Sequence, residues 1–179
     1  MNWLYIVLAC LIGLPLLVLL IGLCLDRDHV ASVTFTLHRP PAEVFAVIAD
    51  HQGAAKWRSD LQAVEVQPPV AGRARFLERG ANGPIAFEVV RSEPPALHEL
   101  RIADDTLAFG GGWRFELSAD GSGTRVVITE DGFVKNPIFR TLSRSVFSLT
   151  ATLEGYARAL GRRFGEDVEP ATTLAHGHS

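Results

Sequence analysis

Between residues 31 and 131, short strand-like segments alternate with turn-forming residues, and this pattern limits the folds open to the chain. Each segment alternates apolar and polar residues or is rich in β-branched and aromatic ones, and proline, glycine or aspartate follows it. The predicted strands are residues 31–37, 61–66, 73–78, 85–92, 97–102, 111–119 and 124–131. From residue 61 onward they follow one another across turns too short for a helical crossover, which predicts an antiparallel meander.

Two helices are predicted around these strands. Pro41 at a first helical position, with Glu43 in the first turn, starts a short helix. After Asn136-Pro137, apolar residues recur at steps of three and four, which predicts one helix of about 28 residues that ends at Gly165. This apolar stripe consists of Ile138, Leu142, Val146, Leu149, Leu153, Tyr156 and Leu160. The predicted fold class is α+β, a curved seven-stranded antiparallel sheet wrapped around a long carboxy-terminal helix.

The amino-terminal segment is uncharged over 23 residues, from Trp3 to Leu25. As a helix it reaches about 35 Å, enough to cross a hydrocarbon core about 30 Å thick. A cleaved signal peptide is the alternative, but no basic residue precedes the apolar run and no small-x-small site follows it. The sequence therefore predicts a single-pass membrane protein with one transmembrane helix that contacts the lipid bilayer through residues 3–25.

The chain is expected to divide into an anchor with its linker (residues 1–28), one domain (29–165) and a polar tail (166–179) that is disordered. Two arginines, Arg27 and Arg39, follow the apolar run, so the positive-inside rule favours a cytoplasmic domain. Both cysteines lie within the apolar run, so the domain holds no disulfide and no thiolate metal site.

The order of these elements carries a resemblance to a known family. The stretches RPPAEVFAVIAD and HQGAAKWRSDLQAVEV, together with the closing helix, resemble the START-like helix-grip (SRPBCC) superfamily, within it the polyketide cyclase/dehydrase and lipid-transport branch. The resemblance covers residues 30–164. In many relatives a proline stands two residues after the tryptophan, whereas Trp57 is followed by Arg58-Ser59-Asp60. The resemblance implies a cavity between sheet and helix for an apolar or amphipathic small molecule, in a family of lipid carriers, hormone receptors, polyketide cyclases and oxygenase domains.

The residues expected at such a cavity lie on the concave strand faces, on the closing helix and at the join before the second strand. They are Trp57, Phe87, Val89, Arg91, Trp113, Phe115, Leu117, Leu149, Leu153 and Tyr156. Two placements stay open: Trp57 is either a wall of the cavity or a plug of the sheet, and Arg91 lies either near the pocket or, as favoured, at an exposed strand end. Arg58 and Asp60 could pair, and exposed charges beside a strand are favoured over a catalytic pair.

Three functions are compatible with these patterns. The leading one is a membrane-anchored domain that binds or carries a lipid, isoprenoid or polyketide-like compound. The alternative is a cyclase/dehydrase-like enzyme, which needs a titratable group in the pocket; the residues to test are His51, Asp60, Arg91 and Glu130, and none is assigned as catalytic. The third is a structural module whose own side chains fill the cavity, so that cavity volume separates it from the first two.

Several kinds of site are not expected. The six histidines are scattered along the sequence without carboxylates at metal-ligand spacing, so neither a metal nor a cofactor is predicted. Gly110-Gly111-Gly112 lacks the lysine and helix of a phosphate loop and is expected to form a bend or bulge. Nucleic acid is not an expected partner, because the net charge is −3 and the basic face of the closing helix is not matched by aromatic residues.

Overall fold

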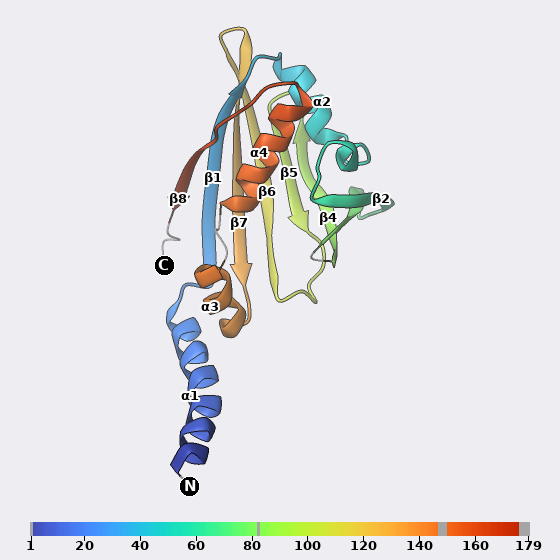
Figure 1. Cartoon of the computed structure of the whole chain (residues 1–179). Helices are drawn as coiled ribbons and strands as arrows, with labels where there is room; N and C mark the ends of the chain where they lie inside the picture. Colours follow the sequence, from blue (N-terminus) through green and yellow to red (C-terminus); the bar gives the residue numbers. More distant parts are fainter. Residues whose placement is uncertain (1, 82, 147–149, 176–179) are drawn as a thin grey trace.

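A computed structural model describes residues 2–81, 83–146 and 150–175 (Figure 1). The helices are α1 (Asn2–Cys24), α2 (Pro41–Ala49), a 3₁₀ turn (Ala54–Lys56), α3 (Pro137–Val146) and α4 (Ala151–Arg163). The strands are β1 (Asp28–Leu37), β2 (Leu61–Val70), β3 (Arg73–Gly80), β4 (Gly83–Glu93), β5 (Leu97–Ile102), β6 (Phe109–Asp120), β7 (Gly123–Val134) and β8 (Ala171–Ala175).

Within the described residues, one sheet holds eight strands in the order β2-β3-β4-β5-β6-β7-β1-β8, and neighbouring strands pair antiparallel. The sheet curves around α4, which lies across its concave face (Figure 1). This is the α+β helix-grip arrangement that the order of elements predicts. The meander is confirmed, and the strands extend beyond the predicted bounds at most of their ends.

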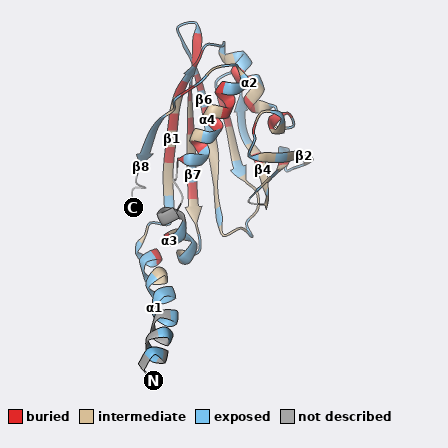
Figure 2. Cartoon of the chain, viewed as in Figure 1, coloured by how far each residue is buried: buried red, intermediate tan, exposed pale blue. Residues whose placement is uncertain are grey.

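The core lies between α4, α2 and the central strands (Figure 2). In β1, the alternating residues Ala31, Val33, Phe35 and Leu37 are all buried, as the period of two predicts. Pro41 begins α2, whose buried residues are Val44, Phe45 and Ile48. From β6 and β7, the core receives Phe115, Leu117, Val126 and Ile128, and from α4 it receives Leu153, Tyr156, Ala157 and Leu160.

The prediction of one long closing helix is wrong. The apolar stripe continues from Ile138 to Leu160, but the structure has two helices, α3 and α4, with residues 147–149 outside the described part. Helix α3 packs mainly against α1 and touches the sheet only at β7: Arg140 donates to the carbonyl oxygens of Gly22 (3.0 Å) and Leu25 (2.8 Å). The stripe residues Ile138 and Leu142 on α3 are exposed, whereas Leu153 and Leu160 on α4 are buried, a difference that a periodic sequence pattern cannot show.

The prediction that residues 166–179 form a disordered tail is also wrong, because residues 166–175 are structured. Glu166 accepts hydrogen bonds from the backbone N–H of His38, and Val168 is buried in the core. Residues 171–175, predicted to be disordered, form β8 and pair with β1, so the predicted sheet lacked one strand. Residues 176–179 lie outside the described part. The predicted helix end at Gly165 agrees with the structure, where this glycine has φ +76°.

Proline and glycine signals were over-interpreted at two places. Strand β2 runs through Pro68-Pro69 to Val70, because it is an edge strand and its register with β3 shifts between Gln67 and Val70, which leaves both prolines outside the pairing. Gly112 lies in β6, whose register with β7 is unbroken, so no bulge forms in this pairing. Glycine is required there because a Cβ at residue 112 would lie 2.5 Å from the carbonyl oxygen of Leu100.

The segment predicted to span a membrane, residues 3–25, forms α1 and projects from one end of the domain (Figure 1). Among the helices of the described residues, none is long and apolar enough to cross a membrane, so the predicted transmembrane helix is not confirmed.

Candidate ligand cavity

A small cavity lies between the concave face of the sheet and α4, beside the loop that follows α2. It is lined by Ile48, His51, Ala54, Arg58, Glu78, Phe87, Leu100, Trp113, Phe115 and Tyr156. Its volume is about 40 Å³. One water molecule in the liquid occupies about 30 Å³, whereas pockets for drug-sized ligands have about 300–1,000 Å³. The concavity is therefore largely filled by the protein's own side chains, and a larger ligand requires part of this wall to move.

An aromatic cluster forms most of the apolar wall. The Tyr156 ring lies 5.3 Å from the ring of Trp57, 5.5 Å from that of Trp113 and 5.3 Å from that of Phe115. The Trp57 and Trp113 contacts are edge-to-face, an arrangement that favours a fixed ring position. Trp57 is half-buried against Tyr156 and the core. Among the described residues it is not one that lines the cavity, so of the two placements left open the structure favours Trp57 as a plug of the sheet.

The other expected lining residues divide into three groups. Phe87, Trp113, Phe115 and Tyr156 line the cavity. Leu117 and Leu153 are buried in the core, and Val89 is half-buried on β4. These three are not among the described residues that line this cavity. Leu149 falls outside the described part of the chain.

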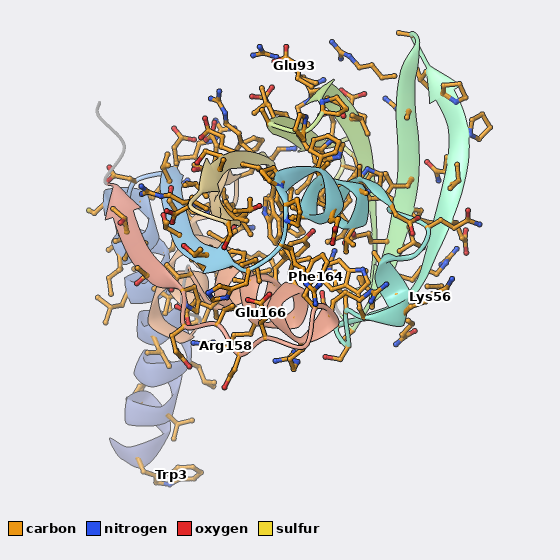
Figure 3. All side chains as sticks on the ribbon, turned by 90° about the horizontal axis from the view of Figure 1, so that it is seen from above. Trp3, Lys56, Glu93, Arg158, Phe164 and Glu166 are labelled. Atoms are coloured by element: carbon orange, nitrogen blue, oxygen red, sulfur yellow. The ribbon has the colours of Figure 1, made fainter. Side chains whose placement is uncertain are left out.

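Arg91 lies on the outside of the sheet. The register of β4 with β5 shifts between Val89 and Arg91, which ends the simple alternation that placed the arginine on the concave face. Its side chain is 51% exposed, and its guanidinium pairs with Glu93 at 2.8 Å. In the view from above, Glu93 lies at the outer rim of the molecule (Figure 3). The favoured placement of Arg91 at an exposed strand end is thus the observed one.

Arg58 is buried at the cavity, contrary to the expectation of exposed charges beside the strand. Only 9% of the residue is exposed. Its guanidinium donates to Glu78 at 2.7 Å and to Asp60 at 2.7 and 3.4 Å, and its central carbon lies 5.2 Å above the Tyr156 ring. The Arg58–Asp60 pair suggested by the sequence is present, but its main buried partner is Glu78. Burial raises the pKa of Glu78, and the Arg58 charge opposes that rise.

The loop after α2 and strand β5 bring two histidines together. The Nε2 atoms of His51 and His98 are 3.2 Å apart, and the Nδ1 atom of His98 lies 3.1 Å from the Ser92 hydroxyl. The His51 ring also stacks on Phe76 at 4.0 Å. Burial, and secondarily His98, lowers the pKa of His51 to about 4, and burial lowers the pKa of His98. Both rings are therefore neutral at pH 7.

The sequence interpretation of scattered histidines is wrong for this pair. His98 shares a strand face with Leu100 and lies opposite Phe115 on β6, so alternation alone could have placed it on the concave face. Its contact with His51 could not be foreseen, because it depends on how α2 and the following loop return across the sheet. In the described part of the chain, no group of three or more His, Cys, Asp or Glu side chains could hold a metal ion.

Comparison with known proteins identifies the family. Residues 28–168 match the model of a family described as polyketide cyclase/dehydrase and lipid transport. The chain belongs to this family. Among curated proteins, no sequence matches the chain.

Solved structures share the fold of this chain at low sequence identity. A Thermus thermophilus protein has a TM-score of 0.63 at 19% identity over 75% of this chain and 95% of its own. The Zhui aromatase/cyclase of Streptomyces sp. R1128 has a TM-score of 0.59 at 16% identity over 75% and 92%. A START superfamily protein of Mycobacterium smegmatis has a TM-score of 0.58 at 17% identity over 75% and 96%. At these identities the likeness concerns the fold alone.

A carboxyl group with a raised pKa lies on the same face of the sheet as Trp113. Glu130 of β7 is opposite Trp113 of β6, and burial raises the pKa of Glu130 to about 7, an effect that a hydrogen bond from Trp113 opposes. His29 Nε2 lies 4.0 Å from Glu130. Of the four titratable residues considered for an enzyme, His51 is the only one among the described residues that lines this cavity.

Proposed function

We propose that this domain binds a small, mainly apolar molecule whose carbonyl, carboxylate or phenolate oxygen faces Arg58. The observation that carries the proposal is a buried guanidinium in a wall that is otherwise largely aromatic and aliphatic. Glu78 and Asp60 engage three of the five N–H donors of an arginine, so further donor capacity remains for a ligand oxygen. A hydrogen bond from an ionised donor in such a wall is about twice as strong as one between neutral groups.

Ligand binding must be coupled to expansion of the cavity. The enclosed 40 Å³ cannot hold a lipid, so the aromatic cluster or α4 has to move away from the sheet. Apolar contacts then supply affinity at about 25 cal/mol per Å² of buried apolar area, reduced by the cost of opening and ordering. The family's lipid-transport and cyclase/dehydrase description supports a ligand of this class without naming it.

The test is native mass spectrometry of the gently extracted full chain, followed by titration with the fluorescent fatty acid cis-parinaric acid. Phe87→Trp enlarges a lining side chain and is expected to weaken uptake about tenfold or more. Phe109→Trp is the matched control, because Phe109 is exposed. A wild-type chain that carries no small molecule and takes up no probe would instead indicate a structural module with a filled core.

A cyclase/dehydrase-like activity is the second candidate function. The observation that favours it is His51, a neutral imidazole in the cavity wall together with Arg58 and Tyr156. A neutral imidazole can accept a proton, and a buried guanidinium can stabilise the negative oxygen that proton removal next to a carbonyl creates. Conversion of an added polyketone, followed by mass spectrometry, is the direct test.

We also propose that α1 associates with a lipid surface. Over residues 3–25 the chain carries no charge, and large apolar side chains such as Trp3, Leu14 and Leu17 are more than half exposed. Burial of these side chains in lipid would remove them from water. Flotation of the full chain with liposomes is expected, and Leu14→Arg with Leu17→Arg should abolish it. Equal flotation of both forms would contradict the proposal.

A further inference from the structure

A continuous line of hydrogen-bonding groups joins the surface of the domain to its cavity. Ser92 is exposed at the rim of β4, His98 behind it is 2% exposed, and His51 lines the cavity. The separations are 3.1 Å from Ser92 Oγ to His98 Nδ1 and 3.2 Å from His98 Nε2 to His51 Nε2. Both lie within the range of hydrogen bonds of moderate length.

The neutral state of the two rings allows only two arrangements of protons along this line. In the first, Ser92 donates to His98 Nδ1, His98 Nε2–H donates to His51 Nε2, and the His51 proton is on Nδ1. In the second, His51 Nε2–H donates to His98 Nε2, His98 Nδ1–H donates to Ser92, and His51 Nδ1 has no proton. A neutral imidazole has one donor and one acceptor, so the tautomer of one ring dictates that of the other.

Passage between the two arrangements moves one proton between cavity and solvent. His51 Nδ1 takes a proton from a bound molecule and His51 Nε2–H passes its own to His98 Nε2. His98 Nδ1–H then passes its proton to Ser92, whose hydroxyl releases one to water. The reverse sequence delivers a proton to the bound molecule. One proton enters and one leaves in either direction, so neither histidine has to remain charged.

The surroundings favour this neutral exchange over storage of a charge. Phe76 stacks on His51, and the rings of Phe45 and Phe115 lie 5.8 and 6.3 Å from the His98 ring. The charged groups that act on His51 are Asp50 and Arg58, which have opposite signs. An imidazolium in this place would lose hydration without gaining a dedicated carboxylate partner.

We propose that Ser92, His98 and His51 form a proton relay, with His51 as the acid–base group for a ketone bound in the cavity. Proton removal from the carbon next to the carbonyl leaves an enolate, whose oxygen the Arg58 guanidinium stabilises. This inference rests on the cyclase/dehydrase candidate function. It assigns catalysis to His51 and positioning to His98 and Ser92.

The first test reads the tautomers of the ¹⁵N-labelled histidine rings by NMR in the full chain at pH 8. Ser92→Asp offers only acceptors to His98, so the relay should be fixed in the second arrangement and the His51 proton should move to Nε2. Ser118→Asp is the control, because Ser118 is exposed on β6 and has no place in the relay. A Ser92→Asp spectrum in which His98 changes but His51 does not would overturn the relay.

The second test measures deuterium incorporation next to the carbonyl of 2-tetralone in D₂O, after its binding is established by quenching of tryptophan fluorescence. His51→Phe should abolish protein-dependent exchange, and His98→Gln should lower it about 100-fold while quenching persists. His38→Gln, on the exposed surface, is the control. Quenching without exchange in the wild type overturns the relay and leaves ligand binding intact. Absence of quenching counts against the proposed function and the relay together.

Discussion

Single charged residues in the concave wall distinguish this domain from a passive apolar core. Arg58 and Glu78 are buried together, and an isolated charge in either place would be costly. His51 and His98 avoid this cost by remaining neutral, and Glu130 avoids it partly by holding its proton up to about pH 7. Each side chain therefore has a measurable signature in stability.

Loss of the Arg58 charge is expected to destabilise the fold strongly. Arg58→Met leaves the Glu78 carboxylate buried without its main partner, and the free energy of unfolding should fall by about 3–5 kcal/mol. Urea unfolding at pH 7 measures the change. Arg79→Met removes an exposed pair with Glu65 and should change the free energy of unfolding far less, because solvent screens such a pair. Arg58→Met with Glu78→Leu should recover most of the loss; equal effects at residues 58 and 79 would contradict the buried pair.

The His51 pKa predicts a loss of stability in weak acid. Its folded value, about 4, lies below the unfolded value near 6.5, so the unfolded chain binds more protons between these limits. Stability from this group is present above pH 6.5 and is lost as the pH falls to 4, by about 2–3 kcal/mol. Unfolding measured from pH 4 to 8 should show a smaller slope in His51→Phe. An unchanged slope would mean that the His51 pKa does not differ between the folded and unfolded states.

At the scale of elements, the periodicity of apolar residues predicted the structure correctly where an element buries one face against a single core. The strand β1 and the helix α2 follow their sequence patterns, because each buries one face against the same core. The stripe from Ile138 to Leu160 misled, because its α4 half is buried against the sheet whereas Ile138 and Leu142 on α3 are exposed. The cavity residues on β6 were predictable from alternation, whereas the contacts of His98 with His51 and of Arg58 with Glu78 depend on how the segment between α2 and β2 packs across the sheet.

Strand β8 shows why a polar tail can be ordered. Its sequence, ATTLA, lacks a core pattern, but β1 offers it an unpaired edge and Val168 holds the preceding segment in the core. Gly161 permits this approach, since a Cβ there would lie 2.8 Å from the Val168 side chain.

Removal of β8 is expected to weaken the domain and to expose an edge. A chain that ends after Pro170 loses five residue pairs with β1, which corresponds to about 1–3 kcal/mol of stability, and it should associate more readily through the free edge. Thermal unfolding and analytical ultracentrifugation measure both effects. A chain that ends after Ala175 keeps β8 and is the matched control. Identical behaviour of the two truncated chains would show that β8 contributes nothing.

At the scale of the whole molecule, α1 is attached to the domain by α3. Thr141 donates through its hydroxyl to the carbonyl oxygen of Val18 at 2.8 Å, and the guanidinium of Arg140 contacts the carbonyls of Gly22, Leu25 and Val134. One side chain thus joins the end of α1 to the end of β7. A cation at the last carbonyls of a helix also opposes the negative end of its dipole.

Arg140→Ala is therefore expected to loosen the last turn of α1 without unfolding the sheet. Hydrogen exchange of the amides from Gly22 to Leu25 should accelerate about tenfold, since local opening no longer requires displacement of the guanidinium. Arg158→Ala, which removes an arginine paired with Glu154 on α4, should leave these amides unchanged. Exchange of the amides in α4 decides how far the effect reaches. Acceleration confined to α1 means that the helix moves independently of the cavity. Acceleration that extends into α4 means that contacts of α1 can change how readily α4 moves away from the sheet.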